Sequence, residues 1–338
     1  MVTLAEVAKA AGVSPSTVSY VLSGKRAISE PTRARVEQAI SLLGYHPHAG
    51  ARALAGKRSH IIALVVPLHT DVYVPVMMEI AISVTMAARQ FGYDVLLITN
   101  DEGPDGVRRV ARSGLADGVI LMDVQMDDPR IAVLRETGTH SALIGLPRDA
   151  RGLACVDHDF VRAGRLAAEH LAELGHREVA FIGYPAAVYE RHAGYAERTR
   201  SGFEEGARQL GLRAVHRPCD GTYESVAGVF TRILADRPGT TGFVVQNEGA
   251  IGPLLSLLRA AGRVVPEDAS VVALCQEPLA EQFSPRLTAV SGPTRELGTR
   301  AVELVMSRLN GDVPDDVTLL TPVLSRRESS GRAPTKVA

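Results

Sequence analysis

The chain has 338 residues, of which 46% are hydrophobic and 22% are charged. This composition is typical of soluble proteins and excludes disordered and membrane-spanning chains, and the length predicts two folding units or one bilobed unit with an appendage. The N-terminus, MVTLAEVAKAAG, lacks the basic and apolar regions of a secretory signal, so we expect a cytoplasmic protein without a membrane partner. Cys155, Cys219 and Cys275 form no CxxC pair, which favours reduced thiols over a disulfide framework.

Charge is distributed unevenly along the chain. Residues 1–58 contain eight Lys or Arg and three Glu, a net charge of +5, so the remaining residues carry −6. A small basic segment on a larger acidic body predicts that the segment binds a polyanion while the body has another role.

Residues 3–43 predict three short helices. Thr3 and Glu6 have the spacing of a capping box before an apolar stripe that ends at Gly12. A second helix is expected to begin at Pro15, because Ser14 is a favoured N-cap residue and proline is favoured at the first helical position. A third helix is expected over residues 30–43. The apolar residues expected inside the second and third helices are Val18, Val21, Leu22, Val36, Ala39, Ile40 and Leu43.

Three helices with a tight glycine turn describe a helix-turn-helix unit, whose second helix fits the DNA major groove. Helical periodicity alone leaves open a helical cap on an enzyme, and the charge split favours the DNA-binding interpretation. The outward face of the second helix is small, polar and uncharged, and it consists of Pro15, Ser16, Ser19 and Tyr20.

The N-terminal sequence also resembles the lactose-repressor (LacI/GalR) family of bacterial transcription regulators. The resemblance covers about sixty residues continuously, through AGVS..TVS.VL.G, TR..V..AI..LGY.P and AR.LAGK, and it continues through the body to about Ser329. It implies phosphate contacts by Ser14, Thr17, Ser19 and Ser23, and base contacts by Pro15, Ser16 and Tyr20. Tyr20 departs from the family's frequent Arg or His, so the operator sequence cannot be transferred from a relative.

Residues 47–58 are short and Ala-rich, and a helix of this length is marginal alone in water. We expect a hinge that becomes helical only with a second copy on DNA. The resemblance implies that Leu54 wedges into the minor groove with Ala53 beside it, although the residues alone favour simple packing of Leu54. Arg52, Lys57 and Arg58 are expected to be phosphate contacts or solvated charges.

From His60 onward, short apolar runs alternate with helical segments, the pattern of a doubly wound parallel sheet. The seven runs expected as strands are IIALVV, DVLLIT, GVILM, SALIG, VAFIG, GFVVQ and SVVAL. Two such cycles predict two α/β lobes with a cleft between them, like a periplasmic binding protein. The resemblance implies that the chain returns to the first lobe near Leu287 and ends in a helix over residues 295–310. The expected domains are residues 1–46 for DNA binding, 47–58 for the hinge, 59–329 for effector binding and dimerisation, and 330–338 as a flexible tail.

Ligands of open α/β sheets bind at the carboxyl ends of strands. The polar residues expected there are His69, Asp71, Tyr73, Asp123, Tyr184, Gln246, Asn247, Glu248, Cys275, Gln276 and Glu277. The resemblance adds Asp157 and either Arg198 or Arg200. These groups favour a small-molecule effector, such as a sugar or sugar derivative. The family's GFDD stretch is replaced here by Ala-Leu-Cys-Gln at residues 273–276, which leaves the effector class open. Within this stretch, Cys275 is expected to be a packing residue and not a thiol sensor.

The alternative function is a cytoplasmic sugar-binding or sugar-metabolising enzyme with a helical cap. No GxGxxG follows an expected strand, and no P-loop, HExxH or GxSxG is present, so nucleotide, metal and acyl-transfer chemistry lack a candidate and no cofactor or metal is expected. An exported solute receptor would need a signal peptide. We therefore predict a homodimeric repressor that binds a roughly palindromic double-stranded operator and responds to a small molecule.

Overall fold

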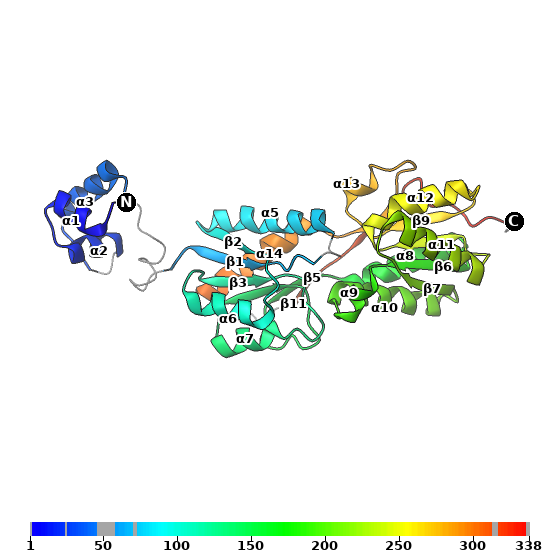
Figure 1. Ribbon diagram of the computed structural model, residues 1–338, viewed down its shortest axis with the longest axis horizontal. Coiled ribbons are helices and arrows are strands. Elements are labelled where there is room, and N and C mark those ends of the chain that lie inside the picture. Colours follow the sequence, from blue (N-terminus) through cyan, green and yellow to red (C-terminus); the bar gives the residue numbers. More distant parts are fainter. Residues whose placement is uncertain (1, 24–25, 46–57, 70–72, 313–316, 336–338) are drawn as a thin grey trace.

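The computed structural model describes residues 2–23, 26–45, 58–69, 73–312 and 317–335. It has an N-terminal unit of three helices and a body of two α/β lobes, each built on a six-stranded sheet (Figure 1). This is the fold class that the sequence predicts. All of the expected hinge except Arg58 lies outside the described residues.

The N-terminal helices are α1 (Leu4–Ala11), α2 (Pro15–Ser23) and α3 (Glu30–Leu43). Thr3 and Glu6 form the predicted capping box, and the Ser14 hydroxyl accepts a hydrogen bond from the backbone N–H of Thr17 at 3.2 Å. Apolar side chains from all three helices share one core. Leu43, expected inside, is instead 37% exposed, and Tyr45 enters the core at that end of α3.

Lobe one is a fully parallel sheet with the strand order β11-β5-β4-β3-β1-β2. Its strands are β1 (Ile61–Val65), β2 (Asp94–Ile98), β3 (Gly118–Leu121), β4 (Ser141–Ile144), β5 (Cys155–His158) and β11 (Val317–Leu320). Alternate side chains of β1 point to opposite faces, where they meet different helices. Helices α5 (Val74–Gln90) and α14 (Thr294–Leu309) cover one face, and α6 (Gly103–Ser113) and α7 (Arg130–Thr137) cover the other.

Lobe two repeats this plan with the order β12-β10-β9-β8-β6-β7, in which only the β10–β12 pair is antiparallel among the described strands. Its strands are β6 (Glu178–Gly183), β7 (Arg213–Pro218), β8 (Gly242–Val245), β9 (Ser270–Ala273), β10 (Thr288–Ser291) and β12 (Val323–Ser325). Helices α8 (Phe160–Glu173) and α10 (Gly194–Gln209) cover one face, and α11 (Tyr223–Asp236) and α12 (Ile251–Ala260) the other. The short helices are α9 (Ala186–Glu190), η1 (Glu248–Ala250) and α13 (Glu277–Ala280).

The chain crosses between the lobes after β5, after β10 and after β11, which the strand orders require. The expected return near Leu287 is misplaced, because Leu287 is fully buried in the core of lobe two and β10 still belongs to that sheet. The return follows Ser291, and α14 then packs on lobe one over the range expected for the last helix.

The end of the chain also differs from expectation. Residues 330–338 were expected to form a flexible tail, but Gly331 donates its N–H to the Ser270 hydroxyl at 3.0 Å and Ala333 donates to the Leu174 carbonyl at 2.8 Å. Ser329 is fully buried and bonds to the Val271 carbonyl. Residues 329–333 are therefore bonded to lobe two.

Helices α8 and α10 approach each other closely because glycine lies on both sides of the contact. A Cβ atom on Gly164 would overlap the carbonyl oxygen of Thr199, and a Cβ atom on Gly202 would overlap that of Val161. Neither neighbour is the end of a flexible side chain, so the helices would have to separate to admit a methyl group.

We expect Gly202→Ala to lower the free energy of unfolding by about 1–3 kcal/mol through overpacking. Gly228→Ala is the matched control, because Gly228 is a helical residue of α11 and an added methyl group there would have no atom within 4 Å. The control should be neutral or slightly stabilising, since alanine is favoured over glycine within helices. Urea unfolding of both variants measures this, and equal effects would contradict the close-contact explanation.

Candidate functional site

The outward face of α2 has the exposure that the sequence predicts. Pro15 and Ser16 are exposed, Ser19 is half-buried and Tyr20 is 37% exposed. The Ser14 hydroxyl lies 2.8 Å from that of Ser16 and 2.9 Å from the Thr17 hydroxyl, so polar groups gather at the N-terminus of the helix. A helix N-terminus with exposed hydroxyls suits phosphate contacts. Ser23 is the last residue of α2, while Ala53, Leu54 and Lys57 lie outside the described residues.

Residues 58–60, where the expected hinge joins the body, are hydrogen-bonded to lobe one. Arg58, expected to contact phosphate or solvent, donates from Nη2 to the Leu309 carbonyl at 2.5 Å and to Asn310 Oδ1 at 3.2 Å. The carboxylate of Asp117 accepts hydrogen bonds from the N–H and hydroxyl of Ser59 and from the N–H of His60, at 2.6, 2.8 and 2.9 Å. The start of the body therefore moves together with lobe one.

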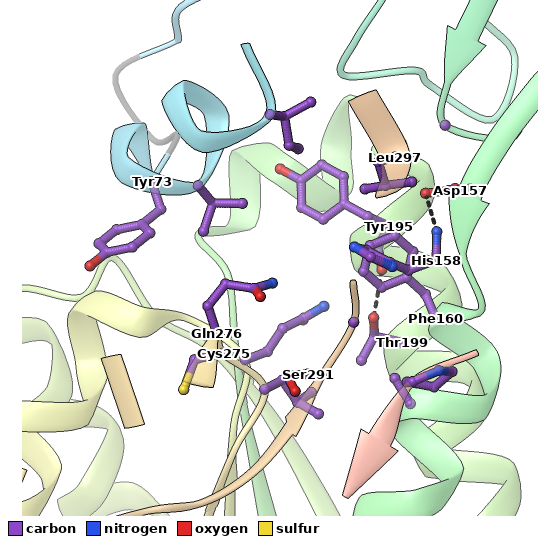
Figure 2. Close-up of a pocket in the computed structure, with 18 of the residues that line it drawn as sticks. Tyr73, Asp157, His158, Phe160, Tyr195, Thr199, Cys275, Gln276, Ser291 and Leu297 are labelled. Carbon is purple, nitrogen blue, oxygen red and sulfur yellow. Dashed lines mark hydrogen bonds between the residues drawn. The ribbon is translucent and has the colours of Figure 1, made fainter. Parts of the chain in front are cut away.

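A cavity of about 170 Å³ lies between the lobes and is lined by residues of both. Its polar lining comes largely from the carboxyl ends of strands, with aliphatic side chains of α5 and α14 completing the wall. In Figure 2, Asp157, His158, Phe160 and Tyr195 gather on one side, Tyr73 lies on the opposite side, and Gln276 and Ser291 lie below. The cavity can therefore contact a ligand through both hydrogen bonds and apolar or aromatic surfaces.

Most of the residues expected at strand ends come together at this cavity. Those that line it are Tyr73, Asp123, Asp157, Tyr184, Gln246, Glu248, Cys275 and Gln276. His69 instead lines a smaller neighbouring hollow with Asp123, with its Nε2 3.5 Å from the Asp123 carboxylate. Asp71 lies outside the described residues.

Four other expected ligand residues do not line the cavity. The Glu277 carboxylate accepts hydrogen bonds from the Ser291 and Ser325 hydroxyls at 2.7 and 2.8 Å. The Asn247 side chain accepts from the Gly249 N–H at 3.1 Å and donates to the Cys219 carbonyl at 2.7 Å, so it holds a turn. Arg200 lies over the ring of Tyr189, 5.0 Å from its centroid. Arg198 donates to the Pro147 carbonyl at 3.4 Å in the other lobe.

The strand-end argument missed lining residues of two kinds. Those on helices include Val76, Met77, Ile80, Phe160, Tyr195, Thr199 and Leu297, and their signal in the sequence is ordinary amphipathic periodicity, which identifies a buried face without saying that the face borders a cavity. His158 and Ser291 end strands β5 and β10, which the sequence reading did not locate. Tyr195 and Phe160 add aromatic surface, and their ring centroids are 6.2 Å apart.

Two buried carboxyl groups lie on opposite walls of the cavity. Asp157, at the end of β5, and Glu248, after β8, are 5% and 9% exposed. Burial raises the pKa of each to about 7, although Tyr184 donates its hydroxyl to Glu248 at 3.1 Å and so favours the carboxylate. Burial also lowers the pKa of His158 to about 4, so this imidazole is neutral at pH 7.

Contacts on one side of the cavity join the lobes directly. The Met126 N–H donates to the His192 carbonyl at 2.8 Å, and the Gly194 N–H donates to the Val124 carbonyl at 3.2 Å. Arg191 of lobe two lies 3.7 Å from the carboxylate of Asp123 in lobe one. This short backbone pairing fixes the orientation of the lobes seen here.

Cys275 lies in the cavity wall and is 4% exposed. Burial raises the pKa of its thiol to about 12, so the reactive thiolate is disfavoured at neutral pH. This environment fits the expected packing role.

Comparison with known proteins identifies the family. The model of bacterial regulatory proteins of the lacI family matches residues 3–48, and that of the periplasmic binding protein-like domain matches residues 168–330. The HTH-type transcriptional regulator CelR of Thermobifida fusca is 32% identical over 332 residues, covering 94% of this chain and 95% of CelR. The chain belongs to the lacI family.

Two solved structures of lacI-family proteins share the whole architecture. The CelR–cellobiose complex has a TM-score of 0.70 at 29% identity and covers 97% of this chain and 100% of its own. The lac repressor dimer bound to operator and the anti-inducer ONPF has a TM-score of 0.82 at 24% identity, covering 98% and 99%, which shows the common fold. This lacI-family chain is a transcriptional regulator, and the enzyme alternative is not favoured.

Two further observations concern the described part of this lacI-family regulator. No described helix combines the length and apolar character needed to traverse a bilayer. Within the same residues, no group of three or more His, Cys, Asp or Glu side chains is arranged to hold a metal ion.

The raised pKa of Glu248 makes stability depend on pH. Because its pKa rises from 4.5 to about 7 in the folded state, Glu248 contributes stability fully below pH 4.5 and loses that contribution as pH rises through 7. Glu248→Gln removes this titration. We expect the variant to gain up to about 3 kcal/mol relative to the wild type between pH 4.5 and pH 8, since a tenfold change in a proton equilibrium corresponds to about 1.4 kcal/mol.

Urea unfolding at several pH values measures the difference between the two proteins. Glu267→Gln, at an exposed position outside the cavity lining, is the control and should follow the wild type at every pH. A Glu248→Gln difference that stays constant with pH would rule out a buried, titrating carboxyl.

Proposed function

We propose that the protein is a cytoplasmic, homodimeric repressor that binds a roughly palindromic operator and is released by a sugar or sugar derivative. The observation that carries the proposal is that the cavity has walls from both lobes, so a bound molecule acts on their relative orientation. The presence of a sugar in the CelR–cellobiose complex supports this effector class.

The link from cavity to DNA runs through lobe one. Arg58, Ser59 and His60 are bonded to lobe one through Leu309, Asn310 and Asp117, so rotation of this lobe displaces the end of the hinge at residue 58. In a dimer, that displacement alters the spacing of the two hinges. Effector and operator then change each other's affinity by the same factor, as thermodynamic linkage requires.

On DNA, the exposed face of α2 enters the major groove. We assign base contacts to Pro15, Ser16 and Tyr20 and phosphate contacts to Ser14, Thr17, Ser19 and Ser23. Pro15 offers no backbone donor, so Ser16 and Tyr20 carry the polar part of base recognition. The hinge adds Leu54 as a minor-groove wedge beside Ala53, with Lys57 near the phosphates.

We expect Leu54→Ala to weaken specific operator binding more than nonspecific binding, because a wedge contributes only where the DNA can bend and unstack. Leu42→Ala is the control, since Leu42 is 78% exposed on α3 and carries no assigned DNA contact. Electrophoretic mobility shifts at fixed salt on operator and random DNA measure both affinities. An equal loss on the two DNAs for Leu54→Ala would contradict the wedge assignment.

A second copy of the chain is the expected partner of lobe one. Along α5, the apolar residues Val74, Met78, Ile82 and Met86 recur every four positions and are 49%, 40%, 56% and 66% exposed. The neighbouring edge strand β2 adds Leu97, which pairs with Leu64 on the face that α5 covers and is 42% exposed. An apolar helical stripe beside an open sheet edge suits a two-fold interface, in which the same surface packs on itself.

We expect Ile82→Asp to shift the protein from dimer to monomer, because it places a charge within this apolar stripe. Val264→Asp is the matched control: Val264 is also 56% exposed but lies in lobe two. Sedimentation velocity across a concentration series measures the assembly state. A dimer of unchanged affinity in Ile82→Asp would place the interface elsewhere.

The proposal as a whole is tested by selecting genomic fragments with the full-length protein and then adding neutral carbohydrates, sugar phosphates and purines. Selective binding that one carbohydrate releases is the expected result. If no fragment is selected in the presence or absence of any compound, the repressor proposal fails.

A further inference from the structure

The described lining of the effector cavity contains neither lysine nor arginine, and its histidine, His158, is neutral at pH 7 because burial lowers its pKa to about 4. Residues 59–335 contain no Lys at all, and the stretches 70–72 and 313–316, outside the described residues, read Thr-Asp-Val and Val-Pro-Asp-Asp. Any cation that met a ligand in this cavity would therefore have to be one of the described arginines.

The arginines around the cavity have other contacts. Arg198 does not line the cavity and donates from Nη2 to the Pro147 carbonyl, while its Nη1 is buried without a hydrogen-bond partner among the described residues. Arg191 lies 3.7 Å from the carboxylate of Asp123. Arg327 pairs with Glu277 and donates to the Leu287 carbonyl at 3.1 Å. Releasing any of them to a ligand would leave a buried carbonyl or carboxylate without its donor, which is unfavourable.

The same cavity contains two buried acidic groups. Glu248 accepts from the Tyr184 hydroxyl at 3.1 Å on the lobe-two wall, and Asp157 accepts from the His158 N–H at 2.9 Å on the lobe-one wall. A phosphate or carboxylate placed between them would meet two groups of its own charge, unless each of them took up a proton. Burial raises the pKa of both to about 7, so above that pH they repel an anion.

Helix N-termini oppose this argument only weakly. Four helices begin at or beside lining residues: α5 beside Tyr73, α8 at Phe160, α10 beside Tyr195 and α14 just after Gly292. The first turn of α8 already bonds to the Asp159 carboxylate, and the Gly194 N–H of α10 bonds to the Val124 carbonyl. A helix N-terminus carries about half a positive charge, less than a single ionised carboxylate. Pro75 also removes one backbone donor from the first turn of α5.

The remaining polar lining is neutral and suits hydroxyl groups. Gln276, Tyr73 and Ser291 offer both donors and acceptors, and Nδ1 of His158 is buried with no hydrogen-bond partner within the described part of the chain. Phe160 and the aliphatic residues of α5 provide apolar surface for a ring face.

Building on the proposed function, we propose that the effector is an uncharged carbohydrate and that Glu248 and Asp157 exclude its phosphorylated and acidic derivatives. The two carboxyl groups therefore determine specificity: they distinguish a free sugar from the products of its phosphorylation or oxidation. The regulator consequently responds to the sugar before either modification.

Isothermal titration calorimetry of the full-length protein at pH 8 tests this with matched pairs of probes. The pairs are glucose with glucose 6-phosphate, sorbitol with gluconate, and cellobiitol with cellobionate; cellobiose and glucosamine are added singly. Within the second and third pairs, both members have the same residue in open-chain form and differ by a carboxylate, so a loss of binding there reports charge and not ring opening.

We expect at least one neutral carbohydrate to bind, and its charged counterpart to bind at least tenfold more weakly. Glu248→Gln should reduce that ratio severalfold, whereas Glu267→Gln, exposed and outside the lining, should leave it unchanged. Equal or tighter binding of an anionic member in any pair, preferential binding of glucosamine, or no binding by any neutral carbohydrate would overturn the inference.

Operator release measured with the same compounds separates this inference from the proposed function. If anionic sugars alone release the operator, the repressor proposal stands and the charge inference fails. If neutral sugars bind with the expected selectivity and leave operator affinity unchanged, the charge inference stands and the proposed sugar-controlled release fails.

Discussion

The parallel pairing of the strands is the constraint on which the rest of the structure depends. In a parallel sheet every strand ends at the same edge, so the residues that follow β1, β3, β5, β6, β8 and β9 are brought together although they are far apart in the sequence. Because the chain crosses between the lobes three times, the two edges share one cavity. The buried carboxyls of Asp157 and Glu248 face this cavity as a result of that topology.

The junction between the hinge and the body depends on one acidic side chain, that of Asp117, and not on the strand pairing. Asp117 accepts three hydrogen bonds from Ser59 and His60, and Arg58 is bonded to the end of α14. Hydrogen bonds to a charged group contribute more than neutral ones, about 1.5–3 kcal/mol each. This junction is therefore stiff, and motion of lobe one reaches residue 58 without being absorbed at the join.

Features that depend on local sequence, such as helix caps and apolar strands, could be predicted, whereas features that depend on tertiary packing, such as edge strands and cavity-lining helix faces, were mostly missed. Apolar runs and caps located the three N-terminal helices and seven strands, but β5, β7, β10, β11 and β12 were missed. β7 is a half-exposed edge strand with Arg213 and Arg217, and β5 ends in Asp157 and His158, so neither has a long apolar run. The strand-end rule placed Tyr184 and Gln276 at the cavity, but it also predicted Asn247, which holds a turn. Arg200, which the resemblance suggested, lies over the ring of Tyr189.

The contacts between the lobes determine how much binding free energy an effector needs to change the lobe orientation. Two backbone hydrogen bonds, the Arg198–Pro147 bond and the Asp123–Arg191 pair join the lobes beside the cavity. Each hydrogen bond contributes about 1 kcal/mol net. An effector that stabilises another lobe orientation must therefore bind that orientation more tightly by an amount of this order, because a ligand shifts an equilibrium only by its differential affinity for the two states.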